Sequence, residues 1–381
     1  MPVRSQFSTE PGGIAFLAAA PGDEEVIKGW PLVGSAGFLF AQALRAAGLT
    51  ASGDLPADMW QGQRTETRRL LWERRRHSFL YVFNEPLPHG EVKHWCALAP
   101  TVRAEYWREY FGYDWPAIRG AGYLRPEHTH HLERVKQDIL KCQPRLIVPL
   151  GGVALWALTG SALIDEYRGA VAVTSRLVPG IKILPMYEPE RVMQQYKLLV
   201  PLIGDLMKAA REATFPEIRL TKKEIWLDPT LEDLRLFRAL YCDGSRGPLS
   251  VDIETGGRQI SCVGLSPDAH HSIIVPFVDY RKPNRSYWPT AADEQRAWEF
   301  VAEILANPAI EKLFQNGGAF DVFWFLHWAG IEVRNYRHDL RLVHKTLYPE
   351  LPASLKFMGA TYLNSVAWKA GVHHQEDKRD A

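Results

Sequence analysis

The spacing of the short apolar segments is the feature that most constrains the fold of this chain. Segments 249–255, 260–265 and 272–277 follow one another too closely for a helix to fit between them. Strands this close in sequence pair as an antiparallel meander. Earlier apolar segments, such as 79–83 and 145–150, are instead separated by stretches long enough for helices, which favours a parallel sheet. The sequence therefore predicts an α/β protein with two different sheets.

A polar stretch at 208–216 separates these two patterns. A chain of 381 residues exceeds what one core usually serves, at about 150 residues per domain. We therefore expect domains at 1–212 and 213–381. In the first, strands are expected at 13–20, 79–83, 145–150 and 181–184, with a helix at 36–47. In the second, the meander is expected to precede helices at 294–306, 319–329, 339–347 and 354–363 and a strand at 312–315.

Composition excludes several classes of protein. Lysine and arginine number 45 against 44 aspartates and glutamates, a net charge of +1, so bulk charge cannot supply affinity for nucleic acid. No stretch approaches 18 uninterrupted apolar residues, and the N-terminus lacks an export pattern, so we expect no membrane span and a cytoplasmic location. The four cysteines, Cys96, Cys142, Cys242 and Cys262, form no CxxC pair. We therefore expect neither a zinc site nor an iron–sulfur cluster.

Carboxylates in the second domain suggest a metal site. Asp252 and Glu254 are two apart on a predicted strand and so share one face. The apolar run before Asp252 predicts that it ends a buried strand, where paired carboxylates are costly without a cation. Further on, Asn316 and Asp321 follow another strand and open a helix. Taken alone, Asp321 is better explained as a helix cap than as a metal ligand.

The segments DIET at 252–255, NGGAFD at 316–321 and the run from His338 to Leu355 together resemble the 3′–5′ proofreading exonuclease domain of family A DNA polymerases. These enzymes belong to the DEDD, ribonuclease H-like superfamily. The resemblance covers about residues 217–381 and implies a mixed sheet flanked by helices. It also implies that the carboxylates bind two Mg²⁺ or Mn²⁺ ions, and that two further residues contact the terminal nucleotide. The implied metal ligands are Asp252, Glu254, Asp321 and Asp380, and the implied nucleotide contacts are Asn316 and Phe320.

Phe320, and Asp339 in the third segment, also have simpler interpretations. We expect Phe320 to pack in the core first, and Asp339 to cap the helix that it opens. Asp380 stands one residue from the end of the given sequence, and Glu376 takes the place of the tyrosine in the family pattern. The sequence is therefore either a fragment of a longer polymerase, or a nuclease that is impaired or completed by a partner.

The first domain contains AAAPGDEE at 18–25 and GWPLVGSAG at 29–37, which resemble the signature of family 4-like uracil-DNA glycosylases over about residues 12–208. The resemblance implies a three-layer αβα fold with a central parallel sheet, and it implies that Asn84 contacts a base. Ala19 stands in place of the catalytic glutamate, and Glu188 in place of a histidine that would stabilise the departing anion. We therefore expect a degenerate glycosylase that retains DNA binding.

The densest positive run lies at 64–77. A solvated helix face and a helix that contacts phosphates are equally favoured interpretations. On the second interpretation, Arg68 and Arg69 are candidate DNA contacts.

The leading hypothesis is a DNA replication and repair protein: a metal-dependent 3′–5′ exonuclease behind a glycosylase-like DNA-binding domain. Its expected partners are single-stranded or frayed DNA 3′ ends and possibly a DNA polymerase, in the host cytoplasm if a phage encodes it. Two alternatives stay open: a decayed module that binds DNA or a polymerase without turnover, and an active uracil-DNA glycosylase.

Overall fold

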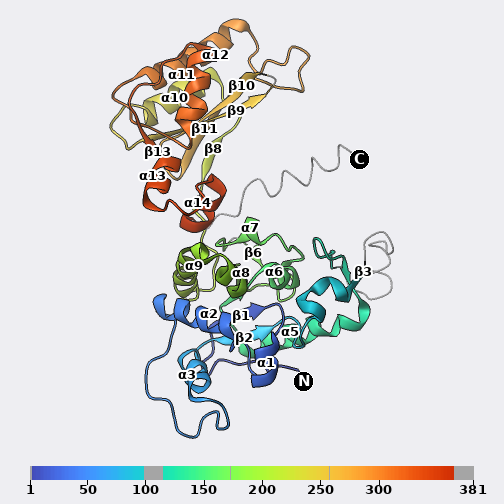
Figure 1. The fold of residues 1–381 in the computed structure, drawn as a ribbon. Coiled ribbons are helices and arrows are strands. Elements are labelled where there is room, and N and C mark those ends of the chain that lie inside the picture. Colours follow the sequence, from blue (N-terminus) through green and yellow to red (C-terminus); the bar gives the residue numbers. More distant parts are fainter. Residues whose placement is uncertain (1, 98–114, 172, 257, 364–381) are drawn as a thin grey trace. The chain divides into compact units, whose positions relative to one another are not determined.

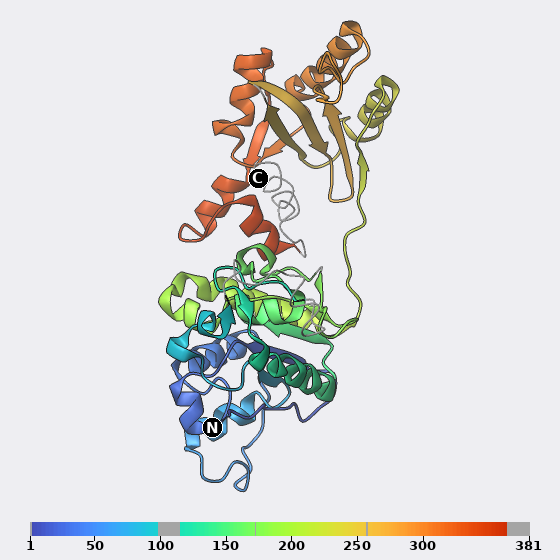
Figure 2. The same cartoon turned by 90° about the vertical axis from the view of Figure 1, so that its right-hand side faces the viewer.

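The computed structural model describes residues 2–97, 115–171, 173–256 and 258–363 (Figures 1 and 2). The chain divides into two compact units: unit 1 is Met1–Ile218 with Lys356–Ala381, and unit 2 is Arg219–Leu355. The last segment of the chain is therefore grouped with the first unit, whereas we expected one division at 212.

Unit 1 is an α/β unit. Its strands are β1 (Ile14–Ala18), β2 (Ser78–Tyr81), β3 (Cys96–Ala97), β4 (Tyr123–Leu124), β5 (Leu146–Pro149), β6 (Val173–Thr174) and β7 (Lys182–Ile183). Its α-helices are α1 (Asp23–Lys28), α2 (Ser35–Ala46), α3 (Thr65–Glu73), α5 (His130–Cys142), α6 (Gly152–Thr159), α7 (Ile164–Tyr167), α8 (Pro189–Gln194), α9 (Leu199–Glu212) and α14 (Leu355–Tyr362). Short 3₁₀ turns occupy Pro88–Gly90, Val92–Trp95, Pro126–His128 and Tyr196–Leu198.

The main sheet of unit 1 has the strand order β2-β1-β5-β7-β6. Strands β2, β1, β5 and β7 run parallel, and β6 adds an antiparallel edge. Every residue of β1, β2 and β5 is buried, as expected for parallel strands covered on both faces. The predicted parallel sheet is confirmed.

The segment that follows unit 2 in sequence packs on unit 1 through α14. The buried ammonium of Lys208 on α9 donates to the carbonyls of Gly169, Ala360 and Leu363 at 2.7–2.9 Å. Arg168 donates to Thr361 at 2.7 Å and pairs with Asp205 at 2.8 Å. All three donors of the ammonium are thus used, two of them by the C-terminal segment.

Unit 2 contains a six-stranded sheet and helices. Its strands are β8 (Glu224–Trp226), β9 (Leu249–Gly256), β10 (Gln259–Ser266), β11 (His271–Pro276), β12 (Lys312–Phe314) and β13 (Tyr336–Asp339). Its helices are α10 (Leu231–Tyr241), α11 (Ala291–Ala306), α12 (Asp321–Ala329) and α13 (Leu340–Leu347), with a 3₁₀ turn at Gly317–Ala319.

The sheet of unit 2 is mixed, with the strand order β13-β12-β9-β10-β11-β8. Strands β9, β10 and β11 pair antiparallel, so the predicted meander is confirmed. Strands β12 and β13 pair parallel on one side of it, and β8 pairs parallel with β11 on the other. Strands β8 and β13 were not predicted, since each is short and lacks an apolar run.

Within the described ranges, no helix combines the length and the apolar character needed to cross a membrane.

Candidate functional site

Three neighbouring parallel strands of unit 2 end at the same edge of the sheet. Leu313 of β12 pairs with Ser250 of β9, and Phe314 pairs with Asp339 of β13. Because carboxyl ends of parallel strands meet at one edge, the residues that follow them converge there. Asp252 lies within β9 just beyond the residues that pair with β12, the segment from Asn316 to Asp321 follows β12, and Asp339 ends β13. Strand order thus brings three separate sequence segments to one place.

Strand β9 alternates cleanly between its two faces. Val251 and Ile253 are buried, whereas Asp252 and Glu254 are exposed. The expectation that Asp252 ends a fully buried strand and avoids an exposed face is therefore wrong. The apolar residues before it belong to the opposite face of a strand with one solvated side. The expectation that Asp252 and Glu254 share a face is confirmed.

Asp321 is the buried carboxylate of the site. It begins α12, is 2% exposed, and its Oδ1 accepts a hydrogen bond from the backbone N–H of Ile253 at 3.1 Å. Burial, and after it the neighbouring charge of Asp252, raise the pKa of Asp321 from 3.8 to about 6. The carboxylate of Asp252, within β9, and that of Asp321, at the start of α12, therefore interact through charge.

The loop before Asp321 is held in a fixed shape. Asn316 has a φ of +66°, in the left-handed region that asparagine tolerates better than most residues. Its backbone N–H donates to Asp339 at 3.0 Å, and its side-chain oxygen accepts from Arg341 at 2.9 Å. At Gly317 an added Cβ would lie 2.3 Å from the Cβ of Phe314, so a larger residue does not fit.

Asp339 caps helix α13, as predicted. Its Oδ1 accepts from the N–H groups of Arg341 and Leu342 at 2.9 and 3.3 Å, and its Oδ2 accepts from the Tyr336 hydroxyl at 2.6 Å. Burial acts to raise the pKa of Asp339, but these hydrogen bonds outweigh it and hold the pKa below its ordinary value. A pocket of about 480 Å³ adjoins Asp339 and is lined partly by Tyr336 and Leu342.

Two other residues were predicted for the site, Phe320 and Asp380. Phe320 is 39% exposed and packs loosely on Trp324, at 6.3 Å between ring centroids, so the expectation that it belongs to the core is wrong. Its place at the first turn of an exposed helix face leaves the ring outside the sheet. Asp380 lies outside the described residues.

The donor chemistry at this edge suits a hard divalent cation, because carboxylate oxygens are the ligands that Mg²⁺ and Mn²⁺ prefer. Within residues 2–97, 115–171, 173–256 and 258–363, no group of three or more His, Cys, Asp or Glu side chains is gathered closely enough to hold a metal ion. Asp252 and Asp321 therefore form a partial set.

Tyr336 and Arg341 are residues of the site that sequence reasoning missed. Tyr336 donates to Asp339, and Arg341 fixes the Asn316 side chain. No local pattern distinguishes either one: Tyr336 lies on the same strand as Asp339, and Arg341 acts on Asn316 in a different segment.

In unit 1, the two candidate arginines have different roles. The guanidinium of Arg68 donates to the carbonyls of Pro56, Ala57 and Met59 at 2.8–3.0 Å, so it holds the preceding loop. Arg69 pairs with Glu73 at 3.1 Å, and its side chain is 75% exposed. Only Arg69 therefore has the exposure that a phosphate contact requires.

The loops of unit 1 enclose a pocket of about 630 Å³ at the ends of β1 and β5. Asn84 follows β2 and is half-buried, but it is not among the residues that line this pocket. Glu25, in the motif at 18–25, is 8% exposed. Its carboxylate accepts the backbone N–H groups of Gly22, Val33 and Gly34 at 2.7–3.2 Å, so it braces the glycine-rich loop.

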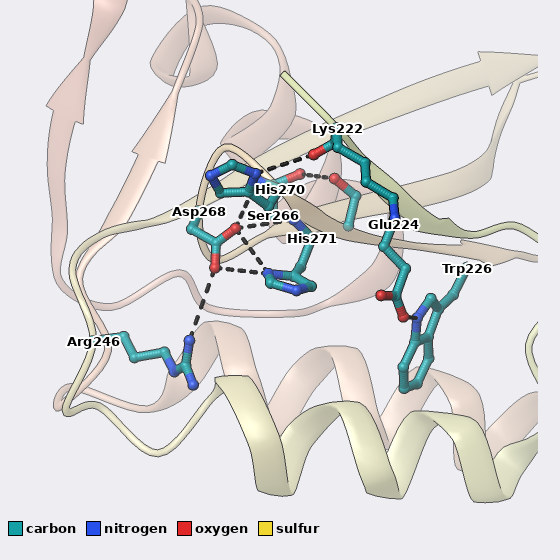
Figure 3. Close-up of polar contacts among 9 residues, drawn as sticks. Lys222, Glu224, Trp226, Arg246, Ser266, Asp268, His270 and His271 are labelled. Carbon is teal, nitrogen blue, oxygen red and sulfur yellow. Dashed lines mark hydrogen bonds and ion pairs between the residues drawn. The ribbon is translucent and has the colours of Figure 1, made fainter. Parts of the chain in front are cut away.

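Figure 3 shows a second polar cluster, at the turn between β10 and β11. Asp268 accepts from the backbone N–H groups of His270 and His271 at 2.7–2.9 Å and from the His271 ring at 3.0 Å. Chiefly through the bond from the His271 side chain, these contacts lower the pKa of Asp268 to about 2. Arg246 pairs with Asp268 at 3.8 Å. The cluster closes an exposed turn.

No protein-family model and no curated protein matches this chain. Among solved structures, it is similar to the EXD2 exonuclease domain soaked in Mg and dGMP, at 17% identity over 41% of this chain and 84% of that domain, with a TM-score of 0.24. It is also similar to the Aedes aegypti Nibbler EXO domain, at 13% identity over 41% of this chain and 75% of that one, with a TM-score of 0.30. TM-scores this low leave any functional proposal to rest on the chain's own residues.

Proposed function

We propose that unit 2 is a metal-dependent 3′–5′ exonuclease of the ribonuclease H-like type, acting on DNA. One observation carries the proposal: the carboxylate of Asp252 on β9 interacts through charge with that of Asp321 at the start of α12, and Asp321 is buried and oriented by the Ile253 N–H. Like charges placed this way destabilise the fold by themselves, and a divalent cation would relieve that cost. Such a costly arrangement is typical of a functional site.

Each residue has a role within the proposal. Asp252 and Asp321 would hold a divalent cation, with Glu254 on the same exposed face and Asp380 as a fourth ligand. When bound, such ions activate water and stabilise the leaving oxygen of a phosphodiester. Asn316 would contact the terminal nucleotide, and Asp339 fixes the backbone of Asn316 and thereby the loop that precedes Asp321. Phe320, which is exposed, would stack on a base.

The first unit would contribute DNA binding, with Arg69 as an exposed phosphate contact. A DNA polymerase would be the partner that presents frayed 3′ ends, in a replication or repair setting. These finer statements rest on the motif resemblance and on the exposure of the residues concerned.

The test is a degradation assay on oligonucleotides labelled at the 5′ end. A 3′–5′ exonuclease produces a ladder of shortened labelled products with Mg²⁺ or Mn²⁺ and none with EDTA, and matched DNA and RNA strands distinguish the substrate. Asp252→Asn is expected to lower the rate at least 100-fold, on the scale of losing a catalytic electrostatic contact. Glu232→Gln, an exposed carboxylate on α10, is the matched control and should not change the rate.

Degradation that persists in EDTA, or in Asp252→Asn, would contradict the proposal. Release of the labelled terminal nucleotide first would reverse the polarity.

A further inference from the structure

The pocket of unit 1 has an unusual wall for a protein that would handle nucleic acid. Of the residues that line it, three are carboxylates, Asp23, Glu188 and Glu190, and none is lysine or arginine. His89 is the remaining titratable group on the lining. The pocket therefore repels phosphate and attracts groups that donate hydrogen bonds.

Glu188 supplies the specific feature. Its Oε2 atom is buried and has no hydrogen-bond partner among the described residues. An added Cβ at Gly151 would lie 2.5 Å from this atom, so the carboxylate lies directly against the Gly151 backbone. A buried carboxylate oxygen that lacks a donor is costly. Glu188 is also among the residues that line the pocket, so its carboxylate is an acceptor available to a ligand N–H group there.

The neighbouring carboxylates reinforce this character. Partial burial, and after it the charges of Glu188 and Glu25, raise the pKa of Glu190. Glu25 is already satisfied by three backbone N–H groups, so Glu188 and Glu190 are the carboxylates that face a ligand.

The remaining walls suit a flat ring. Leu87, Leu150 and Val153 provide apolar surface, and Pro21 and Pro86 complete it. The volume of about 630 Å³ lies within the range of small-molecule pockets.

We infer that this pocket binds a planar nitrogen heterocycle that presents adjacent N–H donors, of the guanine type, with Glu188 as the acceptor. Guanine offers a ring N–H beside an amino group on one edge, and a carboxylate can accept from both. Uracil offers a single N–H between two carbonyls, and these carbonyls would face the carboxylate oxygens. The pocket should therefore prefer guanine over uracil, whichever reaction unit 2 performs.

The test uses the full chain and isothermal titration with guanosine, inosine, uridine and MnCl₂. Guanosine should bind at least tenfold more tightly than uridine, and inosine, which lacks the amino group, should lie between them. Glu188→Gln should weaken guanosine binding at least tenfold, whereas Glu127→Gln, an exposed carboxylate elsewhere in unit 1, should not change it. Leu87→Trp should also abolish binding by filling the pocket while keeping Glu188.

Two further binding measurements identify the source of the ligand. Oligo-dG and oligo-dT strands show whether the base is bound as a free nucleoside or within a strand. Equal or tighter binding of uridine, absence of guanosine binding at millimolar concentration, or Mn²⁺ binding that depends on Glu188 would each overturn the inference. Because Leu87→Trp and the wild type are compared by circular dichroism, loss of binding through misfolding is recognised. None of these results depends on nuclease activity, so failure here is distinguishable from failure of the proposed exonuclease.

Discussion

Replacing Asp321 by asparagine should stabilise unit 2 at neutral pH while abolishing the proposed nuclease activity. Asparagine keeps the shape of the side chain and an oxygen that can accept the Ile253 N–H. It removes the buried negative charge that lies near Asp252. The wild-type residue therefore costs stability in the absence of a cation, as active-site groups commonly do.

The magnitude follows from the pKa of Asp321, which is raised from 3.8 to about 6. A difference of this size corresponds to roughly 3 kcal/mol, at about 1.4 kcal/mol per pKa unit. The folded state binds the proton of Asp321 more tightly than the unfolded state does. The stabilisation of the fold by protonated Asp321 is therefore fully present below pH 3.8, and it is lost as the pH rises to about 6. Above pH 6, Asp321→Asn should exceed the wild type by up to ~3 kcal/mol. Near pH 3.5 the two should be equal.

The assay is thermal unfolding in EDTA at pH 3.5 and pH 7, followed by a titration with Mg²⁺. Mg²⁺ should raise the melting temperature of the wild type and leave that of Asp321→Asn unchanged, since a ligand stabilises only the state that binds it. Asp339→Asn is the matched contrast: hydrogen bonds lower the pKa of Asp339, so its neutralisation should destabilise the unit at pH 7. The reasoning is refuted if Asp321→Asn is less stable than the wild type in EDTA at pH 7.

Three further tests address the structure around the site and in unit 1. Lys208→Met leaves three carbonyls without their donor. At ~1.5–3 kcal/mol per charged hydrogen bond, it should lower the free energy of unfolding by at least ~3 kcal/mol and speed proteolysis of residues 356–363. An unchanged digestion rate would contradict the packing of α14. Gly317→Ala should cost ~1–3 kcal/mol by overpacking against Phe314, whereas at Gly318 the nearest atom to an added Cβ is 3.7 Å away and alanine should be tolerated; equal melting temperatures for the two variants would count against this. Arg68→Gln should lower the melting temperature by freeing the loop at 56–59. Arg69→Gln should change the free energy of unfolding by less than ~0.5 kcal/mol, but it should weaken DNA binding and reduce the salt dependence of that binding. The reverse pattern would exchange the roles assigned to the two arginines.

The positions of the regular elements were largely predictable because they depend on local patterns. The predicted helix at 36–47 corresponds to Ser35–Ala46, and the predicted strand at 145–150 to Leu146–Pro149. Apolar periodicity and glycine stops act over a few residues, so they are visible in the sequence. Strand β13 escaped prediction because Tyr336–Asp339 has no apolar run, and it forms only by pairing with β12.

The candidate site was predictable in its residues and less so in its environment. The spacing of Asp252 and Glu254 placed both on one face, which the alternation of β9 confirms. Burial could not be inferred in the same way, since Asp252 and Phe320 are more exposed than expected. Exposure depends on which elements from elsewhere cover a side chain, and local sequence carries little information about that.

By itself, the sequence determined two α/β blocks, an antiparallel meander and the carboxylates of one strand face, since each follows from spacing along the chain. Only the tertiary structure brought Asp321 against the Ile253 N–H, assigned Arg68 to its own loop, and left Glu188 with a buried oxygen that has no partner among the described residues. These properties arise from strand order and from packing between segments far apart in sequence. Charge interactions and burial depend on distance in space, so they become definite only once the fold is formed.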